Sequence, residues 1–335
     1  MKLVDAVLAV GGRWAAQALS VVSGPSLSIL TFHRVLARPD PIFPAEVDAA
    51  RFDRLMALVA RSFEVLPLQQ AVRLLQQGAL PPRALAITFD DGYADNHDIA
   101  LPILQRHGLR ACFFVATGFL DGGRMFNDTV IECIRRSPLP EVDLGVLGLG
   151  RLPLGSPAQR AAAIEKVIPV VKFRSTEQRA PLLAQLQRQC QPSSLPDDLM
   201  MSRRQLQALG AAGMEIGAHT VHHPILCQLS DAQAEAELRD GRDELRRLTG
   251  QPVTLLAYPN GLPDRDYDLR HVAMARRLGF EAAVTTASGV ARPGQDPFQL
   301  PRYTPWNPSP WSWLPSLAAK RRTRNFRTAL QSGGA

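Results

Sequence analysis

The 335-residue sequence lacks several patterns that mark special classes of protein. Its four cysteines form no CxxC pair, which argues against a structural zinc site. Basic residues are not interleaved with aromatic residues, so no nucleic-acid partner is expected. Apolar residues make up 46% and charged residues 21%, which is ordinary for a soluble protein. The chain is long enough for one large domain or two ordinary ones with a sizeable core.

The N-terminal segment, residues 1–24, lacks the continuous apolar run of a signal peptide or a membrane span. Asp5, Arg13 and Gln17 interrupt its apolar residues. We therefore expect a protein that is cytoplasmic or peripheral to the membrane. The remaining apolar residues predict one face of an amphipathic helix, which either packs on the domain or lies on a membrane surface.

The C-terminal segment, residues 306–335, is basic and rich in tryptophan. The formal net charge is +7, and a fair part of the excess lies in residues 320–327. This run is either a solvated end or a contact with anionic lipid or polymer. Trp306, Trp311 and Trp313 either pack in the core or at a membrane interface, or stack on sugar rings. The sequence predicts no oligomeric state.

Apolar runs typical of strands alternate with amphipathic helical patterns along the chain. Strands are expected at residues 27–32, 84–89, 111–116, 214–218, 253–258 and 282–285, and helices at residues 48–61, 68–77, 99–107, 202–212, 231–248 and 268–278. Repeated strand–helix units predict a parallel sheet or barrel with its site at the C-terminal ends of the strands. Residues 122–200, with one expected helix at 157–171, are interpreted as an insertion that forms a lid or a substrate platform.

Two acids follow the expected strand at residues 84–89. Asp90 and Asp91 are adjacent, and Gly92 comes directly behind them. Strand ends of this kind open onto clefts where side chains converge. A lone Asp-Asp-Gly sequence is most often only a turn.

A histidine cluster follows the expected strand at residues 214–218. His219 and His223 are separated by four positions, and Pro224 favours a loop over a helix there. One carboxylate and two histidines form a ligand set for a divalent metal, and the second carboxylate is left for proton transfer. His222, between the two, is interpreted as an exposed neighbour.

These motifs together resemble the polysaccharide deacetylase family, which is carbohydrate esterase family 4 with its NodB-homology domain. The first motif matches Thr-Phe-Asp-Asp-Gly at residues 88–92 without substitution, and the second matches His-Thr-Val-His-His-Pro at residues 219–224. Residues 258–261, Tyr-Pro-Asn-Gly, match the third motif in part. The resemblance covers about residues 27 to 305. It implies an α/β fold, a distorted (β/α) barrel of fewer than eight regular strands with a helical insertion between the first two motifs.

The resemblance also implies residue roles. Asp91, His219 and His223 would bind the metal, and Asp90 would be the general base. The backbone N–H of Tyr258 would face the oxyanion. Zinc is the first choice of metal, with cobalt, nickel or manganese as alternatives.

Three departures from the family pattern concern the residues around the base. No arginine occurs in residues 255–257, so Arg302 is our candidate to orient Asp90 through a forked contact. No histidine follows His271, so the usual late general acid is missing. His33, after the first strand, is our candidate replacement, because some family members carry an equivalent histidine. The alternative is that His33 and Arg302 have only structural roles. Asn127 and Asp128 either line the cleft or cap a helix.

The predicted function is metal-dependent removal of N-acetyl groups from a glycan or glycolipid in bacterial exopolysaccharide or cell-envelope metabolism. Two alternatives remain: an O-acetyl esterase or deformylase that uses the same site, and a catalytically silent glycan-binding or scaffold protein. The expected organisation is an N-terminal segment at 1–24, a catalytic domain at 25–305 and a tail at 306–335.

Overall fold

A computed structural model describes residues 25–174, 176–305 and 328–329. Our predictions for the amphipathic segment at 1–24, for the basic run at 320–327 and for Trp306, Trp311 and Trp313 lie outside the described residues. No helix in the described ranges has the length and apolar character needed to cross a membrane.

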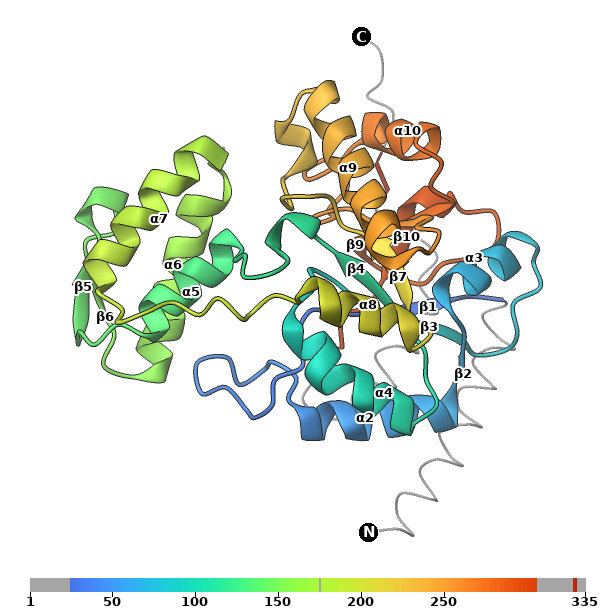
Figure 1. Ribbon diagram of the computed structural model, residues 1–335, viewed down its shortest axis with the longest axis horizontal. Helices are drawn as coiled ribbons and strands as arrows, with labels where there is room; N and C mark the ends of the chain where they lie inside the picture. Colours follow the sequence, from blue (N-terminus) through green and yellow to red (C-terminus); the bar gives the residue numbers. More distant parts are fainter. Residues whose placement is uncertain (1–24, 175, 306–327, 330–335) are drawn as a thin grey trace.

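The sheet is a nearly closed barrel of parallel strands, as the sequence predicted (Figure 1). Its seven strands, in spatial order, are β1 (Ser28–Phe32), β3 (Ala84–Phe89), β4 (Cys112–Val115), β7 (Glu215–Ala218), β8 (Leu255–Ala257), β9 (Ala282–Ser288) and β10 (Leu300–Arg302), and the short β2 (Glu64–Val65) pairs with the start of β3. The barrel closes between β10 and β1. The Thr31 N–H donates to the Tyr303 carbonyl at 3.0 Å, and the Tyr303 N–H donates to the Ile29 carbonyl at 2.8 Å. All seven strands therefore point their carboxyl ends toward one rim.

Helices cover the outside of the barrel (Figure 1). They are α2 (Ala49–Ser62), α3 (Leu68–Gln76), α4 (Leu101–Arg106), α8 (Arg203–Ala211), α9 (Asp231–Thr249) and α10 (Leu269–Arg277). The first and last residues of these helices lie close to the ranges predicted from the sequence, because local sequence signals determine where a helix begins and ends. The Asp48 carboxylate accepts the Arg51 N–H at the start of α2, and Ser202 and Ser230 form capping boxes with Gln205 and Gln233.

A separate lobe interrupts the barrel between β4 and β7, where the sequence predicted an insertion (Figure 1). It contains α5 (Phe126–Arg135), β5 (Glu141–Asp143), β6 (Arg151–Pro153), α6 (Pro157–Lys172) and α7 (Thr176–Cys190). The lobe has its own apolar core, built around Val130, Ile164 and Leu186. Ile42, from the loop after β1, joins this core. The lobe is therefore anchored to the barrel beside the rim where the strands end.

Two parts of the lobe and one strand differ from the sequence prediction. Residues 141–153, where no strand was predicted, form an antiparallel hairpin, with β5 paired to β6. Helix α7 was not predicted, because its polar residues and the internal Pro181 give it only a weak apolar face. Strand β10 was not predicted because it has three residues, one of which is Pro301.

Candidate metal and catalytic site

The turn after β3 places the two aspartates at the rim of the barrel. Asp91 has a φ of 75° and Gly92 a φ of 91°, so the chain passes through two consecutive left-handed residues. A Cβ on Gly92 would lie 2.9 Å from Cγ1 of Val115 in the next strand. Glycine is therefore required at this position for both its backbone angle and its close approach to β4.

The turn after β7 presents the two histidines. Thr220 and His223 have φ values of 66° and 52°, and the Thr220 hydroxyl accepts the backbone N–H of His223 at 3.0 Å. This side-chain turn explains why a hydroxyl residue follows His219 in the motif. The turn holds His219 and His223 in a T-shaped pair, with ring centroids 4.7 Å apart.

Asp91, His219 and His223 meet in space. Oδ1 of Asp91 lies 3.4 Å from Nε2 of His219 and 3.5 Å from Nε2 of His223. His219 is 2% exposed and Asp91 8% exposed, whereas His223 is 16% exposed and lines a pocket, so the meeting point is buried on one side and reachable from the other. Nδ1 of His219 lies 2.7 Å from the Ala257 carbonyl, which fixes the proton on Nδ1 and leaves the lone pair of Nε2 toward Asp91.

The residues present fit a divalent cation. Oδ1 of Asp91 is buried and has no hydrogen-bond partner among the described residues. Metal–ligand bonds of about 2.0–2.2 Å in tetrahedral geometry separate neighbouring ligand atoms by about 3.4 Å, which is close to the separations between Asp91 and the two rings. A carboxylate with two imidazoles suits zinc and other first-row metals.

The charges around this point favour a cation. Although burial alone would raise the pKa of Asp91, His219 and His223 hold it well below its usual range. Burial lowers the pKa of His223 to about 4, so the ring is neutral and free to act as a ligand near pH 7. The pKa of His219 is raised, because Asp91 and Asp90 outweigh the lowering effect of its burial.

Asp90 lies beside the cluster and is paired with Arg302 from β10. Nη1 and Nη2 of Arg302 donate to the two oxygens of Asp90 at 2.7 and 2.6 Å. Nε of Arg302 donates to the Thr285 carbonyl at 2.9 Å, which fixes the plane of the guanidinium. The forked contact expected from the sequence is therefore present. Burial raises the pKa of Asp90, but the guanidinium more than offsets this and lowers it overall.

His33 follows β1, which pairs in register with β3 so that Phe32 is opposite Phe89. Its ring is close enough for a positive charge there to lower the pKa of both Asp90 and Asp91. The Asn96 side chain donates to the His33 carbonyl at 2.8 Å and fixes the turn that carries the ring. His33 is thus placed near the two aspartates, on the side of the neighbouring strand.

Tyr258 does not offer a free N–H. Its backbone N–H donates to the Val284 carbonyl at 3.2 Å, as part of the pairing between β8 and β9. The prediction that this group faces an oxyanion is therefore not supported by the geometry. The Tyr258 ring is fully buried and stacks on Tyr267 with centroids 4.0 Å apart, which indicates a packing role.

Asp128 belongs to the first turn of α5 but does not cap it, because the residue at the cap position is Met125. Its Oδ1 accepts the hydroxyl of Tyr93 at 3.0 Å, and burial raises the pKa of Asp128 to about 7. This contact ties the lobe to the turn that carries Asp91, two residues before Tyr93.

Sequence reasoning missed Glu237, a residue of α9 that holds the histidine turn in place. Its carboxylate accepts the backbone N–H groups of Val221 and His222 at 2.9 and 2.8 Å and the ring of His222 at 2.7 Å. His222 itself is 60% exposed and faces away from the cluster, as expected. No local signal marks Glu237, because its importance depends on which face of α9 packs against the turn.

A second group with metal-ligand chemistry consists of Cys227, Asp268 and His271. Here Nδ1 of His271 accepts the backbone N–H of Asp268 at 3.0 Å and completes the capping box of α10. The helix cap explains this arrangement.

Comparison with known proteins agrees with the fold and the motifs. The polysaccharide deacetylase family matches residues 77–138 and 177–283, which together are half of the chain. YxkH of Bacillus subtilis (strain 168), named as a polysaccharide deacetylase, is 20% identical over 241 residues. That alignment covers 72% of this chain and 58% of YxkH, so the chain spans little more than half of its relative.

Two solved structures share the fold. IcaB from Ammonifex degensii has a TM-score of 0.57 and 20% identity, with 90% of this chain and 98% of that chain covered. The Streptococcus pyogenes deacetylase PplD, solved in complex with acetate, has a TM-score of 0.55 and 20% identity, with 84% of this chain and 92% of that chain covered. The barrel, its rim of acids and histidines, and the family match define one class: this chain belongs to the polysaccharide deacetylase family.

Proposed function

We propose that this protein removes N-acetyl groups from a glycan or glycolipid by metal-dependent hydrolysis, in bacterial exopolysaccharide or cell-envelope metabolism. One observation carries the proposal. The buried Oδ1 of Asp91 faces two imidazole nitrogens at 3.4 and 3.5 Å, with the ionised Asp90 next to it in the chain. Zinc is the proposed metal, held by Asp91, His219 and His223.

A divalent cation bound there supplies a Lewis acid, which polarises the acetyl carbonyl and lowers the pKa of water toward about 7. Asp90 takes the proton from the attacking water. Arg302 keeps Asp90 ionised and fixed in direction through the forked contact, so Arg302 is a positioning residue rather than a group that touches the substrate.

His33 protonates the departing amine in this proposal. His33 follows β1, the strand paired with β3, so it comes from the strand end next to that of the two aspartates, and histidine is a common general acid. Because the Tyr258 N–H is engaged in the sheet, the oxyanion would be stabilised in this proposal by the cation that Asp91, His219 and His223 hold.

The same arrangement can hydrolyse O-acetyl or formyl groups, since the acyl chemistry differs little. The silent glycan-binding alternative is less well supported, because Arg302 pairs with Asp90 and the side chains of Asp91, His219 and His223 lie close enough together to hold a metal ion.

Acetate release from chitopentaose tests the proposal. We expect hydrolysis by the purified full chain, loss of hydrolysis with a chelator, and recovery when zinc is added. Asp90→Asn should lower kcat by about 10²- to 10⁴-fold while zinc stays bound. Asp240→Asn, which changes an exposed acid on α9, is the matched control. Faster release from an O-acetylated xylan than from chitopentaose would favour the esterase. Binding of chitopentaose without any acetate release would favour the silent protein.

A further inference from the structure

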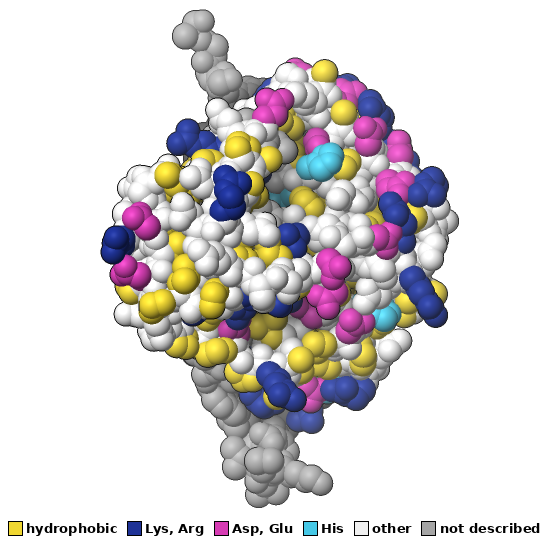
Figure 2. Space-filling model, turned by 60° about the vertical axis from the view of Figure 1, so that its left-hand side comes forward, with side chains coloured by type: hydrophobic (Ala, Val, Ile, Leu, Met, Phe, Trp, Pro, Cys, Tyr) yellow, Lys and Arg dark blue, Asp and Glu magenta, His cyan; other side chains and the backbone are white. Residues whose placement is uncertain are grey.

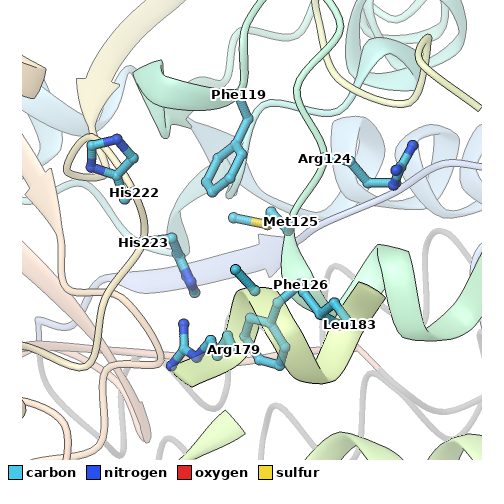
Figure 3. Close-up of a pocket in the computed structure, with 9 residues that line it drawn as sticks. Phe119, Arg124, Met125, Phe126, Arg179, Leu183, His222 and His223 are labelled. Atoms are coloured by element: carbon cyan, nitrogen blue, oxygen red, sulfur yellow. The ribbon is translucent and has the colours of Figure 1, made fainter. Parts of the chain in front are cut away.

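A pocket of about 200 Å³ lies between the lobe and the histidine turn, and its walls come from both. The lobe contributes Phe126, Arg179 and Leu183, and the barrel contributes Phe119 and His223 (Figure 3). Since His223 belongs to the proposed metal set, whatever occupies this pocket is next to the reacting group. In a space-filling view, the molecule is hollowed where the lobe meets the barrel, with a histidine on one rim and a basic side chain on the other (Figure 2).

Arg179, near the start of α7, points across the pocket toward the ring of His223 (Figure 3). Its guanidinium carbon lies 4.5 Å from the centroid of the Phe126 ring. Nη2 donates to the Lys172 carbonyl at 2.7 Å, whereas Nε is buried without a hydrogen-bond partner. These contacts hold the planar group in one orientation and leave part of its donor capacity unused.

No carboxylate of the described residues neutralises Arg179. Within the described ranges it forms no ion pair, and burial lowers its pKa with no acidic group to oppose the shift. Two other arginines of the lobe do have acidic partners: Arg135 pairs with Asp40 at 2.5 Å, and Arg136 pairs with Glu132 at 2.8 Å. A half-buried and uncompensated guanidinium is costly, so its place in a pocket wall points to a ligand that supplies the missing charge.

A second cation lies close by. Lys172, at the end of α6, has a lowered pKa, chiefly because of burial, with Arg265 and Arg179 adding to the effect and Asp266 opposing it. Among the residues that the structure describes, Lys172 also has no ion pair. Lys172 does not line the pocket, but its backbone carbonyl accepts from Arg179, so its positive charge lies close behind the pocket wall.

We propose that Arg179, supported by Lys172, binds an anionic substituent of the glycan, a carboxylate or a phosphate, next to the acetamido group that is hydrolysed. The inference rests on the proposed deacetylase function and adds a substrate class to it. A forked guanidinium matches the planar carboxylate and the phosphate alike, and the aromatic wall of Phe126 and Phe119 suits the face of the sugar ring that carries the anion.

The test compares matched pairs of substrates. For the carboxylate, the pair is a hyaluronan hexasaccharide and the same compound with its carboxyl groups reduced to alcohols. For the phosphate, the pair is chitobiose 1-phosphate and chitobiose. The readout is the ratio of kcat/KM for the anionic member to that for the neutral member, measured by acetate release. We expect at least one pair to give a ratio well above one, and the pair that does so identifies the anion.

Substitution of Arg179 should remove this preference. Arg179→Gln should lower the ratio by roughly 10- to 100-fold, mainly through KM, as expected for a lost charged hydrogen bond. Arg179→Lys should keep part of the preference, and Lys172→Gln should lower it by less. Arg174→Gln removes the same charge from an exposed position of the lobe and should retain the wild-type ratio. Melting curves for each variant verify folding.

Two results would overturn the inference. One is hydrolysis of the neutral substrates with no preference for either anion, which would leave the deacetylase function standing. The other is a preference that Arg179→Gln and Lys172→Gln leave unchanged. Calorimetric binding of the four compounds separates the two proposals further. Arg179-dependent binding of an anionic compound, without hydrolysis of any, would support the anion site and contradict the proposed function.

Discussion

Arg302 and Asp90 form a buried forked ion pair across 212 positions of sequence, at 2.7 and 2.6 Å. The arginine is 0% exposed and the aspartate 3% exposed. Since β10 closes the barrel beside β1, the last strand brings the arginine to the end of β3. The family motif places the orienting arginine elsewhere, and here a different strand supplies the same contact.

Loss of this pair should damage both stability and catalysis. Arg302→Met leaves the Asp90 charge buried and unpaired, so the free energy of unfolding should fall by about 3–5 kcal/mol near pH 7. The pKa of Asp90, now lowered by the guanidinium, should rise, and the acid limb of the kcat/KM profile should therefore move to higher pH. Urea unfolding and a pH–rate profile measure the two effects. Arg302→Lys retains the positive charge but loses the pair of parallel hydrogen bonds to Asp90, so it should shift the acid limb less than Arg302→Met does. An unmoved limb in Arg302→Met would show that the guanidinium does not tune Asp90.

The histidine turn packs on a glycine of α9. A Cβ on Gly241 would lie 2.7 Å from the carbonyl carbon and oxygen of Thr220, which are backbone atoms that cannot easily move aside. Gly241→Ala should therefore displace the turn and weaken zinc binding by about 10-fold or more, although alanine is normally the better helix former. Gly210→Ala in α8 is the control, because its new methyl would meet only the flexible end of Gln251. Calorimetric zinc titration compares them. Equal zinc affinity in both variants would contradict this account of the turn.

The site motifs were predictable because their chemistry is local. Gly92 is required by a left-handed turn against Val115, and Thr220 by its hydrogen bond to the His223 backbone, so both leave a signature in the sequence. The alternation of strands and helices predicted the barrel in the same way, since the barrel helices carry apolar faces and α2, α8, α9 and α10 also carry side-chain caps.

The residues that were missed depend on long-range packing. Glu237 is one acid among several on α9, and only the placement of the helix beside residues 220–222 gives it a role. Helix α7, which carries Arg179, has too weak an apolar face to stand out. The Tyr258 N–H was expected to be free, but the register of β8 with β9 gives it a partner, and register is set by the sheet as a whole.

Asp128 should make the stability of the protein depend on pH. Burial raises the pKa of Asp128 from 3.8 to about 7, so the folded state favours the neutral carboxyl. The stabilising contribution is fully present below pH 3.8 and is lost as the pH rises through 7. Asp128→Asn removes this dependence while it keeps an acceptor for the Tyr93 hydroxyl.

As the pH rises from 5 to 8, the free energy of unfolding of Asp128→Asn should therefore increase by roughly 2–3 kcal/mol relative to that of the parent protein. Urea unfolding of chelator-treated protein at several pH values measures the difference. Two stability curves that run parallel across this range would contradict the assignment of a neutral Asp128.

His222 and His223 are neighbours, but only His223 is a proposed ligand, so their alanine variants form a matched pair that tests the metal site. His223→Ala removes a proposed ligand and should lower zinc affinity by about 100-fold or more, with a parallel loss of acetate release. His222→Ala removes a ring that is 60% exposed and bonded to Glu237, and should leave zinc content unchanged. Zinc content after dialysis, measured by atomic emission, distinguishes the two. Equal losses would indicate that the turn, rather than the ligand, was disturbed.

An anomalous diffraction map from crystals of the protein grown with zinc would show directly whether Asp91, His219 and His223 hold the metal. We expect a single strong peak within about 2.0–2.2 Å of Oδ1 of Asp91 and Nε2 of both His219 and His223. An active, zinc-dependent protein whose anomalous peak lies elsewhere, with nothing among these three atoms, would contradict this expectation.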